Sequence, residues 1–481
     1  MHVRTLTTII AIAILLCGCS NDQKSDMTTP VIRESSDWQN PISQRVSPDI
    51  ATSPRCYSYG WAKTWGGSGW DYGQDVAVDH AGNIFVTGAF YDTVDFDPGP
   101  KTDYRTSTGI ANIFLSKFDT IGNFKWVRTW GGPGFNGDHD YAAGVVVDNF
   151  GGVYVSGKFW GVADCDPSDD IDLHGTSNST SHFVSKFDSN GAYQWAQAWN
   201  MSVSVPYGLA ICDKNTICLT GWFQGTKDFD PGPEVDNHTG SGYLSRFDIN
   251  GDYLGACAWD GLGFSIAADN SDNIYVAGYF SDTVDFDPSD NIDLRTSNGD
   301  RDAYVSKFDV FGNYLWVRAW GGPEREGADG LAISSIGDVC VSGPFVGTVD
   351  FDPGAGIYEG DFSEGQNSYL SKFDALGNLQ WAQTWTTGYF GDIAIDPEGF
   401  IYATDAKFTS SGEFQWMHTW GGYSSRSLAV DGLKAVYAIG GFLGVQDFAP
   451  HNLPCDSDPD LHDAGGSANS YLVKFLPDGC W

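Results

Sequence analysis

One phrase of sequence returns along almost the whole chain. It is clearest between Asp302 and Asp352, where AYVSKFDVFGNYLWVRAWGG leads to GLAISSIGDVCVSGPFVGTVDFDP. A tryptophan marks the equivalent position of each copy, at Trp65, Trp130, Trp199, Trp259, Trp320, Trp385 and Trp420, with spacings of 60 to 69 residues and a last step of 35. Such a period indicates an array of like units, so most of the chain is predicted to form one large repeat domain.

One copy reads as four short strands. In residues 75–130 the apolar and β-branched runs 75–78, 84–90, 112–118 and 124–130 are separated by Asp- and Gly-containing turns, and no run shows a helical period. Seven such meanders predict an all-β, seven-bladed β-propeller of four-stranded antiparallel blades. The sixth unit, 386–420, lacks the Asp-rich loop and is expected to be a reduced blade. The last unit stops at its third strand, so the N-terminal strand 57–65 is predicted to complete it.

The outermost strand of each unit carries paired tryptophans, as in Trp126 and Trp130. Because side chains alternate along a strand, both indoles lie on one face, where they can fill the gap between blades. A sugar-binding stripe is the alternative. The residue between them is often basic, as in Lys63, Arg128 and Arg318, and could stack on the rings.

The chain has a formal net charge of −36, with 41% hydrophobic residues. Aspartate accounts for most of the acidity, and it is both a turn former and a cation ligand. Phosphates would be repelled, so we expect no nucleic-acid partner and no attraction to anionic lipid. The sequence predicts no certain cofactor, with Ca²⁺ as the candidate.

The N-terminus has the pattern of an export signal. His2 and Arg4 precede an apolar run from Ile9 to Leu16, which is too short to span a bilayer, and Cys17-Gly18-Cys19 follow. Leu16 to Cys19 resembles a bacterial lipobox, which predicts a signal peptide at 1–18 and a lipidated Cys19; an ordinary signal peptide is the alternative. Residues 19–55 are predicted to be a disordered tether and 56–481 the propeller. We therefore expect an exported protein, anchored by its N-terminal lipid to a bacterial membrane, at the outer membrane or the cell surface.

The remaining cysteines would meet an oxidising compartment. Cys56 and Cys480 lie at the two ends of the repeat region and are predicted to form a disulfide that fastens its closure. Cys212 and Cys218 flank a predicted hairpin turn and could bridge it. Cys165 and Cys340 replace apolar residues of other copies and are interpreted as core thiols. The pairing of Cys257 and Cys455 stays open, and no spacing matches a zinc site.

The repeated words resemble a known family. GNIFVTG, DNIYVAG, TVDFDPG and SKFD-x-x-GN are similar to the bacterial SBBP repeat, the seven-bladed β-propeller repeat family, over about residues 57–481. The resemblance implies an exported or surface protein without an assigned catalytic site. The short sixth unit departs from the pattern.

Paired aspartates recur in one loop of five units, where each pair brackets Phe or Cys before a proline. The candidate cation ligands are Asp95, Asp97, Asp164, Asp166, Asp228, Asp230, Asp285, Asp287, Asp350 and Asp352. Clustered carboxylates suit Ca²⁺, although the spacing is not that of an EF-hand. The alternatives are a structural turn whose carboxylates are neutralised by a nearby Arg or His, such as Arg105 or His174, and a catalytic carboxylate pair.

The loops between units vary most, and they should open on the same face as the aspartate loops. Their aromatic and acidic residues make a candidate ligand face: Trp70, Asp71, Tyr72, Asp138, His139, Asp140, Tyr141, Tyr207, Glu324, Glu326 and Asp329. Exposed loops without any partner are the alternative.

We infer from these patterns a monomeric, lipid-anchored cell-envelope propeller that binds or scaffolds a protein or a glycan. The alternative is an extracytoplasmic carbohydrate-active hydrolase or lyase with carboxylates near the axis, which would need two of them about 5 to 9.5 Å apart. An assembly scaffold without a pocket is the third interpretation.

Overall fold

The structured part of the chain is a ring of antiparallel sheets. The computed structural model describes residues 58–134, 139–202, 204–385, 391–403, 406–417, 425–449 and 459–476. The chain divides into two units, Met1–Gln44 and Arg45–Trp481, and every described residue belongs to the second. Cys19, Cys56, Asp138, Cys455 and Cys480 lie outside the described residues, as do the predicted segments 1–18 and 19–55.

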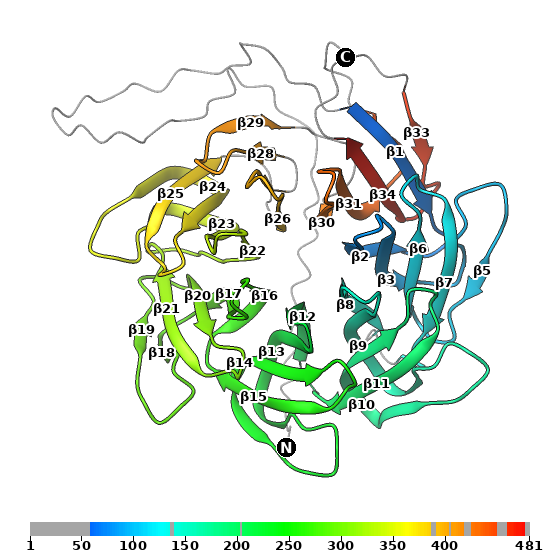
Figure 1. The fold of residues 1–481 in the computed structure, drawn as a ribbon, viewed down its shortest axis with the longest axis horizontal. Helices are drawn as coiled ribbons and strands as arrows, with labels where there is room; N and C mark the ends of the chain where they lie inside the picture. The colour runs from blue at the N-terminus through cyan, green and yellow to red at the C-terminus, as the bar shows by residue number, and fades with distance from the viewer. Residues whose placement is uncertain are drawn as a thin grey trace, which may run out of the picture. The chain divides into compact units, whose positions relative to one another are not determined.

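Seven four-stranded sheets surround a common axis, which confirms the predicted seven-bladed β-propeller (Figure 1). From the innermost strand outward, blade 1 is β2 (Tyr72–Val78), β3 (Ile84–Phe90), β6 (Asn112–Phe118) and β7 (Phe124–Trp130), and blade 2 is β8 (Tyr141–Val147), β9 (Val153–Asp164), β10 (Leu173–Phe187) and β11 (Tyr193–Asn200). Blade 3 is β12 (Ser204–Asp213), β13 (Thr216–Asp228), β14 (Asn237–Asp248) and β15 (Tyr253–Trp259). Blade 4 is β16 (Leu262–Ala268), β17 (Ile274–Phe280), β20 (Asp302–Phe308) and β21 (Tyr314–Trp320).

The remaining blades follow the same order. Blade 5 is β22 (Gly330–Ile333), β23 (Val339–Asp350), β24 (Glu359–Phe373) and β25 (Leu379–Trp385), and blade 6 is β26 (Ile393–Ile395), β27 (Ile401–Ala403), β28 (Ala406–Phe408) and β29 (Phe414–Met417). Blade 7 is β30 (Ser425–Val430), β31 (Val436–Phe442), β34 (Asn469–Leu476) and β1 (Ser58–Trp65). Short ribbons extend three blades at the rim: β4 (Thr93–Asp95) with β5 (Tyr104–Thr106), β18 (Thr283–Asp285) with β19 (Leu294–Thr296), and β32 (Val445–Asp447) with β33 (Leu461–Asp463).

The ring is closed by strands from opposite ends of the sequence. β1 pairs with β34 so that Ser58 lies opposite Leu476 and Trp65 opposite Ser470, which confirms the predicted completion of the last blade. Blade 6 has strands of only three or four residues, as expected from its short sequence. Among the described residues every regular element is a strand, and no helix there is long and apolar enough to cross a membrane.

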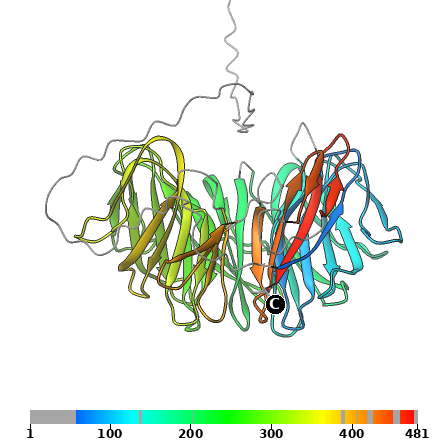
Figure 2. The same ribbon diagram turned by 90° about the horizontal axis from the view of Figure 1, so that it is seen from above.

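The strands run from one face of the ring to the other (Figure 2). The tight turns between the first and second strands of a blade, and between the third and fourth, share one face, which we call the hairpin face. Gly82 and Thr120, from the two turns of blade 1, lie side by side there. The other connections form the loop face, where Gly66 at the end of β1 pairs with Asp95 of blade 1.

The repeated Ser-Lys-Phe-Asp word links one blade to the next. Lys117 Nζ donates to Ser189 O in the turn of blade 2 at 2.6 Å, and Lys186 Nζ donates to Ile249 O in blade 3 at 2.8 Å. The same contact from Lys474 Nζ to Thr120 O, at 2.9 Å, spans the closure between blades 7 and 1. The lysine therefore ties each of these third strands to its neighbour at the hairpin face.

The tryptophans pack between blades, as expected. Trp130 of blade 1 stacks near Phe183 and Phe187 of blade 2, with ring centroids 6.1 and 5.2 Å apart, and it is only 3% exposed. The predicted cation stacking is also present, since the Arg128 guanidinium lies 5.1 Å from the Trp126 ring. Gly191 of blade 2 covers Trp126 so closely that a Cβ would lie 3.0 Å from the indole.

The cysteines of the described part behave as the sequence suggested. Cys212 and Cys218 form a disulfide across the turn between β12 and β13. Cys165 and Cys340 are buried free thiols in hydrophobic clusters, and burial raises the pKa of the Cys340 thiol to about 12.

Candidate functional site

The paired aspartates lie at the outer rim of the loop face, beside the ribbons β4–β5 and β18–β19 in Figure 1. The apolar residue between the two carboxylates points inward: Phe96 is fully buried and packs against Phe90 and Phe114. The loop is therefore held to its blade by an aromatic side chain, and the carboxylates flank that anchor.

The carboxylates accept hydrogen bonds from their own loop. Asp95 Oδ1 accepts the N–H groups of Asp97 at 3.2 Å and Asp103 at 2.8 Å, and Asp97 Oδ1 accepts the Gly99 N–H at 2.8 Å. The same pattern occurs at the other predicted pairs, Asp164 and Asp166, Asp228 and Asp230, Asp285 and Asp287, and Asp350 and Asp352. These contacts are those of turn-forming aspartates.

The basic residues pair with a different carboxylate from the one expected. Arg105 lies 2.9 Å from Asp103, and His174 lies 3.0 Å from Asp172, rather than against the paired aspartates. The Tyr193 hydroxyl donates to the other oxygen of Asp172 at 2.5 Å. A later aspartate, a basic residue and a tyrosine of the fourth strand thus fix the end of the loop. Within the described ranges, no group of three or more His, Cys, Asp or Glu side chains is placed to hold a metal ion.

The acids at the ends of the inter-blade loops turn inward. Asp71 is fully buried, and its two oxygens accept the N–H groups of Gly67 at 2.6 Å and Tyr91 at 2.9 Å. Asp140 accepts from Gly132 and Trp160 at 2.5 and 2.9 Å in the same way. Each acid clamps its loop onto its own blade, so these two carboxylates of the predicted ligand face do not face solvent.

Glu326 makes the equivalent clamp in blade 5. Its Oε2 accepts the Gly322 N–H at 2.8 Å, and a backbone hydrogen bond from Val346 of β23 also holds the carboxylate. Burial raises the pKa of Glu326 to about 7 and that of Asp71 to about 6. Glu324 is exposed, and the Asp329 N–H donates to Ser342 O at 2.9 Å.

Aromatic and basic side chains gather where blades 3 and 4 meet instead. The rings of Tyr207 and Phe264, from the innermost strands β12 and β16, lie 4.5 Å apart, and Tyr279 of the second strand β17 lies 5.4 Å beyond Phe264. The Arg301 guanidinium, just before the third strand β20, stacks 4.3 Å from the Tyr279 ring. A continuous row of three rings and one cation therefore begins at the innermost strands and runs outward along blade 4.

A second group faces the axis where the ring closes. The Arg426 guanidinium of blade 7 lies 5.0 Å from the Tyr72 ring of blade 1, and its Nη1 donates to Gln74 Oε1 at 2.8 Å. We call the two groups together the axial cluster: Tyr72, Gln74, Tyr207, Phe264, Tyr279, Arg301 and Arg426. The predicted Trp70 is exposed, Tyr141 lies under Lys158, and His139 stacks on Tyr91.

A β-bulge builds the axial cluster. The register of the innermost strands shifts between Gly73 and Asp75, between Pro206 and Gly208, between Gly263 and Ser265, and between Ser425 and Ser427. The extra residues are Gln74, Tyr207, Phe264 and Arg426. A bulge re-aims a side chain, here toward the axis, where these residues meet their counterparts from the next blade. Five residues of the axial cluster are not among those predicted from the sequence: Gln74, Phe264, Tyr279, Arg301 and Arg426. The small residues Ser265 and Ser427, which follow Phe264 and Arg426, are the signal that could have located these two.

Two further acids, absent from the predicted set, link the blades around the closure. Asp75 Oδ2 accepts the Val145 N–H of blade 2 at 2.7 Å, and its Oδ1 accepts from Ser427 Oγ of blade 7 at 2.5 Å. Asp392 of blade 6 accepts the Leu428 N–H of blade 7 at 2.8 Å. Burial raises the pKa of both carboxyls, that of Asp75 to about 6.

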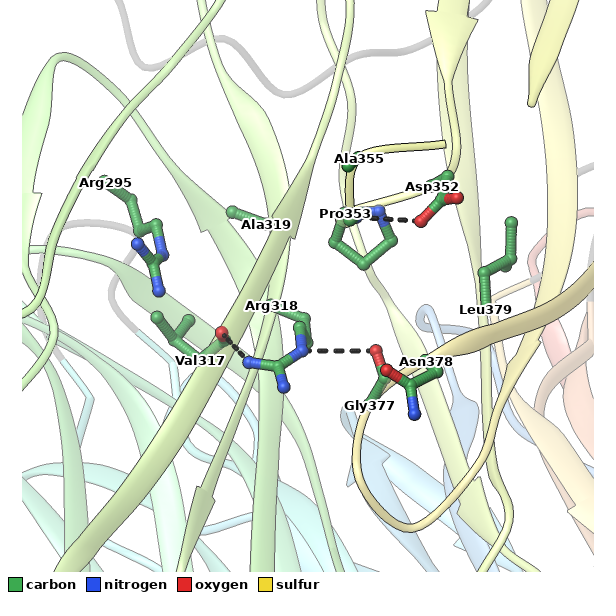
Figure 3. A pocket seen from close by; sticks show the side chains of 11 residues that line it. Arg295, Val317, Arg318, Ala319, Asp352, Pro353, Ala355, Gly377, Asn378 and Leu379 are labelled. Carbon is green, nitrogen blue, oxygen red and sulfur yellow. Dashed lines mark hydrogen bonds between the residues drawn. The ribbon is translucent and has the colours of Figure 1, made fainter. Parts of the chain in front are cut away.

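A polar cavity of about 520 Å³ lies on the flank between blades 4 and 5 (Figure 3). Arg318 and Asp352 line it, but both are engaged with backbone: Arg318 Nε donates to Gly377 O at 3.2 Å, and Asp352 Oδ1 accepts the Gly354 N–H at 2.8 Å. The cavity is thus a gap between blades that is bridged by structural contacts.

The described part defines a seven-bladed β-propeller with an aromatic and basic cluster at its axis. No family model matches the chain. An uncharacterized WD repeat-containing protein of Acanthamoeba polyphaga mimivirus is 25% identical over 309 residues, which are 53% of this chain and 22% of that protein. The chain thus spans about a fifth of that relative.

Among solved structures, the chain is similar to the Pan2 WD40 domain of Neurospora crassa, with a TM-score of 0.45 and 9% identity over 87% of this chain and 97% of that one. It is also similar to BamB of Moraxella catarrhalis, with a TM-score of 0.39 and 11% identity over 88% and 100% of the two chains. The strand order, rather than these overlaps, establishes the propeller.

Proposed function

We propose that the protein is a lipid-anchored binding module of the bacterial cell envelope, of the SBBP repeat kind, whose axial cluster holds a protein or a glycan. The observation that carries this proposal is the stacked row Tyr207, Phe264, Tyr279 and Arg301, which begins at the innermost strands β12 and β16. Rigid aromatic rings with a cation in reach give apolar contact and directed hydrogen bonds at once, which is the composition of binding hot spots.

Two features support a binding role over catalysis. Asp71 and Asp140 present no free carboxylate oxygen at the loop face, because backbone N–H groups occupy both oxygens of each. Of the acids near the axial cluster, Asp75 has its oxygens occupied by the Val145 N–H and the Ser427 hydroxyl, and burial, with a contribution from the charge of Asp329, raises the pKa of Tyr207. A hydrolase or lyase would need an acid beside the bound ligand, whereas a binding module needs only the rings and the cations.

A binding screen tests the proposal. The mature full-length chain is presented with envelope glycans and envelope proteins, with and without Ca²⁺, and binding is measured by titration calorimetry. For a ligand found in this way, Phe264→Ala and Arg426→Gln should each weaken binding about tenfold, as expected for loss of one ring or one cation–π contact of about 1 to 2 kcal/mol. Lys101→Gln, at the exposed rim, is the matched control and should leave the affinity unchanged. If neither Phe264→Ala nor Arg426→Gln changes the affinity for a ligand, that ligand binds outside the axial cluster.

A further inference from the structure

We propose that the hairpin face is a lipid-facing surface that rests on a zwitterionic bilayer. Six large apolar side chains stand at the tips of its tight turns: Ile121, Phe150, Phe311, Ile336, Leu376 and Leu433, which we call the turn tips. They are 67 to 81% exposed, although equivalent turns make the same hydrogen bond with Asn190 or Asn250 at this place. Several such side chains on one face of a soluble domain indicate a contact surface.

The turns hold these side chains rigidly outward. The N–H of Phe150 donates to Asp148 Oδ1 at 2.8 Å, and that of Phe311 donates to Asp309 Oδ1 at 2.9 Å. The same contact fixes Ile121, Leu376 and Leu433. Because the backbone is already ordered, little conformational entropy is lost when the tips enter an apolar phase.

The hairpin face differs from the rim in its ion pairs. Carboxylates at both places accept backbone N–H groups, but several at the hairpin face also have a lysine partner: Lys125 lies 2.7 Å from Asp119, and Lys372 lies 2.7 Å from Asp338. The rim also exposes apolar residues, such as Ile171 and Ile292, but they stand among the paired aspartates, which form no ion pair within the described ranges. Moving carboxylates without a cation partner toward a bilayer is costly, so the rim is the poorer lipid surface.

The chain enters the propeller at this same face. Ser58 lies at the hairpin end of β1, opposite Leu476, while Trp65 lies at the loop end. Residues 20–57 connect it to Cys19, and this step rests on the proposed lipid anchor. If these residues are the disordered tether that the sequence predicts, a chain of that length has an end-to-end distance of roughly 35 Å. It would hold the turn tips near the bilayer at an effective concentration on the order of millimolar, so weak apolar contacts suffice.

Hydroxyl-radical labelling tests the proposal. The chain from residue 19, which keeps the whole described propeller, carries Cys19→Ser and an N-terminal hexahistidine, and is held on phosphatidylcholine vesicles through a nickel-chelating lipid. We expect oxidation of Phe150, Phe311, Leu376 and Leu433 to fall at least threefold relative to the same protein in solution, while Ile171, Ile292 and Leu294 at the rim keep their labelling. Equal labelling of tips and rim on the vesicle overturns the proposal.

A triple variant distinguishes protection by lipid contact from protection that arises only because the vesicle surface is close. Phe150→Asp, Phe311→Asp and Leu433→Asp together should abolish the protection of the remaining tips Ile121, Ile336 and Leu376. Ile171→Asp, Ile292→Asp and Leu294→Asp form the matched control and should keep it. Protection that appears only when an envelope protein is added assigns the face to a protein partner and contradicts the proposal. The artificial anchor makes the result independent of lipidation at Cys19 and of any ligand at the axial cluster.

Discussion

At the scale of single residues, aspartate proves to be mainly a backbone ligand in this fold. Asp95 closes a rim loop, Asp71 clamps an inter-blade loop, and Asp119 caps a turn, each by accepting N–H groups. Sequence alone could locate these residues but not their partners, because a turn-forming aspartate and a calcium ligand have the same side chain and similar spacing. The partners depend on where the loop folds, which Phe96 and its equivalents decide by packing inward.

Glu326 makes stability depend on pH. Its pKa is raised by burial from an ordinary 4.5 to about 7, so between these pH values the folded chain keeps a proton that the unfolded chain has lost. Unfolding then releases a proton, and the free energy of unfolding falls as pH rises from about 5 through 7. Glu326→Gln should raise this free energy by about 1 to 3 kcal/mol at pH 8 and change it little at pH 4. Denaturant midpoints at the two pH values measure the effect.

The exposed neighbour Glu324 provides the control for this prediction. Glu324→Gln should leave the denaturant midpoint unchanged at both pH values. A Glu326→Gln variant that is less stable than the natural protein at pH 8 would show that the buried carboxylate is charged and favourably bound there, and would contradict the expected sign.

At the scale of the blade, the repeated sequence motifs specify contacts between neighbouring blades as well as the strands within each blade. The pattern of strands in the sequence predicted the four-stranded blade, the reduced sixth blade and the closure of the ring. It did not predict the bulges, because a one-residue insertion leaves the apolar alternation of a short strand nearly unchanged. Tyr207 is a candidate from the sequence because it lies in a loop between units, whereas Phe264, at the same bulge of the next blade, is not among the predicted residues.

Three glycines, two in turns and one at a bulge within β13, distinguish the cost of a positive φ from the cost of a close contact at the Cβ position. Gly122 has a φ of +80°, and a Cβ there would lie 2.8 Å from the Trp61 indole of the preceding blade. Gly225 has a φ of +77° with no atom within 4 Å of its Cβ position, and Gly432 has neither constraint. Gly122→Ala should therefore destabilise most, by about 2 to 4 kcal/mol, Gly225→Ala by about 1 to 2 kcal/mol, and Gly432→Ala by less than about 0.5 kcal/mol. Thermal unfolding of the three variants gives the order, and equal effects at Gly122 and Gly225 would remove the role assigned to the indole.

At the scale of the whole molecule, the ring joins its ends without a peptide link between β34 and β1. Three sets of contacts cross this region: the β1–β34 ladder, the Lys474 contact to Thr120, and the Asp75 contact to Ser427. The ladder could be predicted from the truncated last repeat. The contact between Asp75 and Ser427 could not, because it joins two polar residues 352 positions apart, one in β2 and one in β30.

Trp65 and Trp130 test how the closure differs from an ordinary blade junction. They occupy equivalent positions, each is 3% exposed, and each packs on two phenylalanines of the next blade. Alanine at either site should cost about 3 to 5 kcal/mol of stability by leaving a cavity. With the predicted Cys56–Cys480 disulfide reduced, only Trp65 stands on a strand that can detach alone, because β1 is joined to its blade by the β34 ladder and not by a hairpin turn. Trp65→Ala should therefore speed amide hydrogen exchange in β1 and β34 far beyond the change in global stability, whereas Trp130→Ala should leave exchange in β7 tied to global unfolding. Equal exchange in the two variants would mean that the closed ring opens no more easily at its seam than at any other junction.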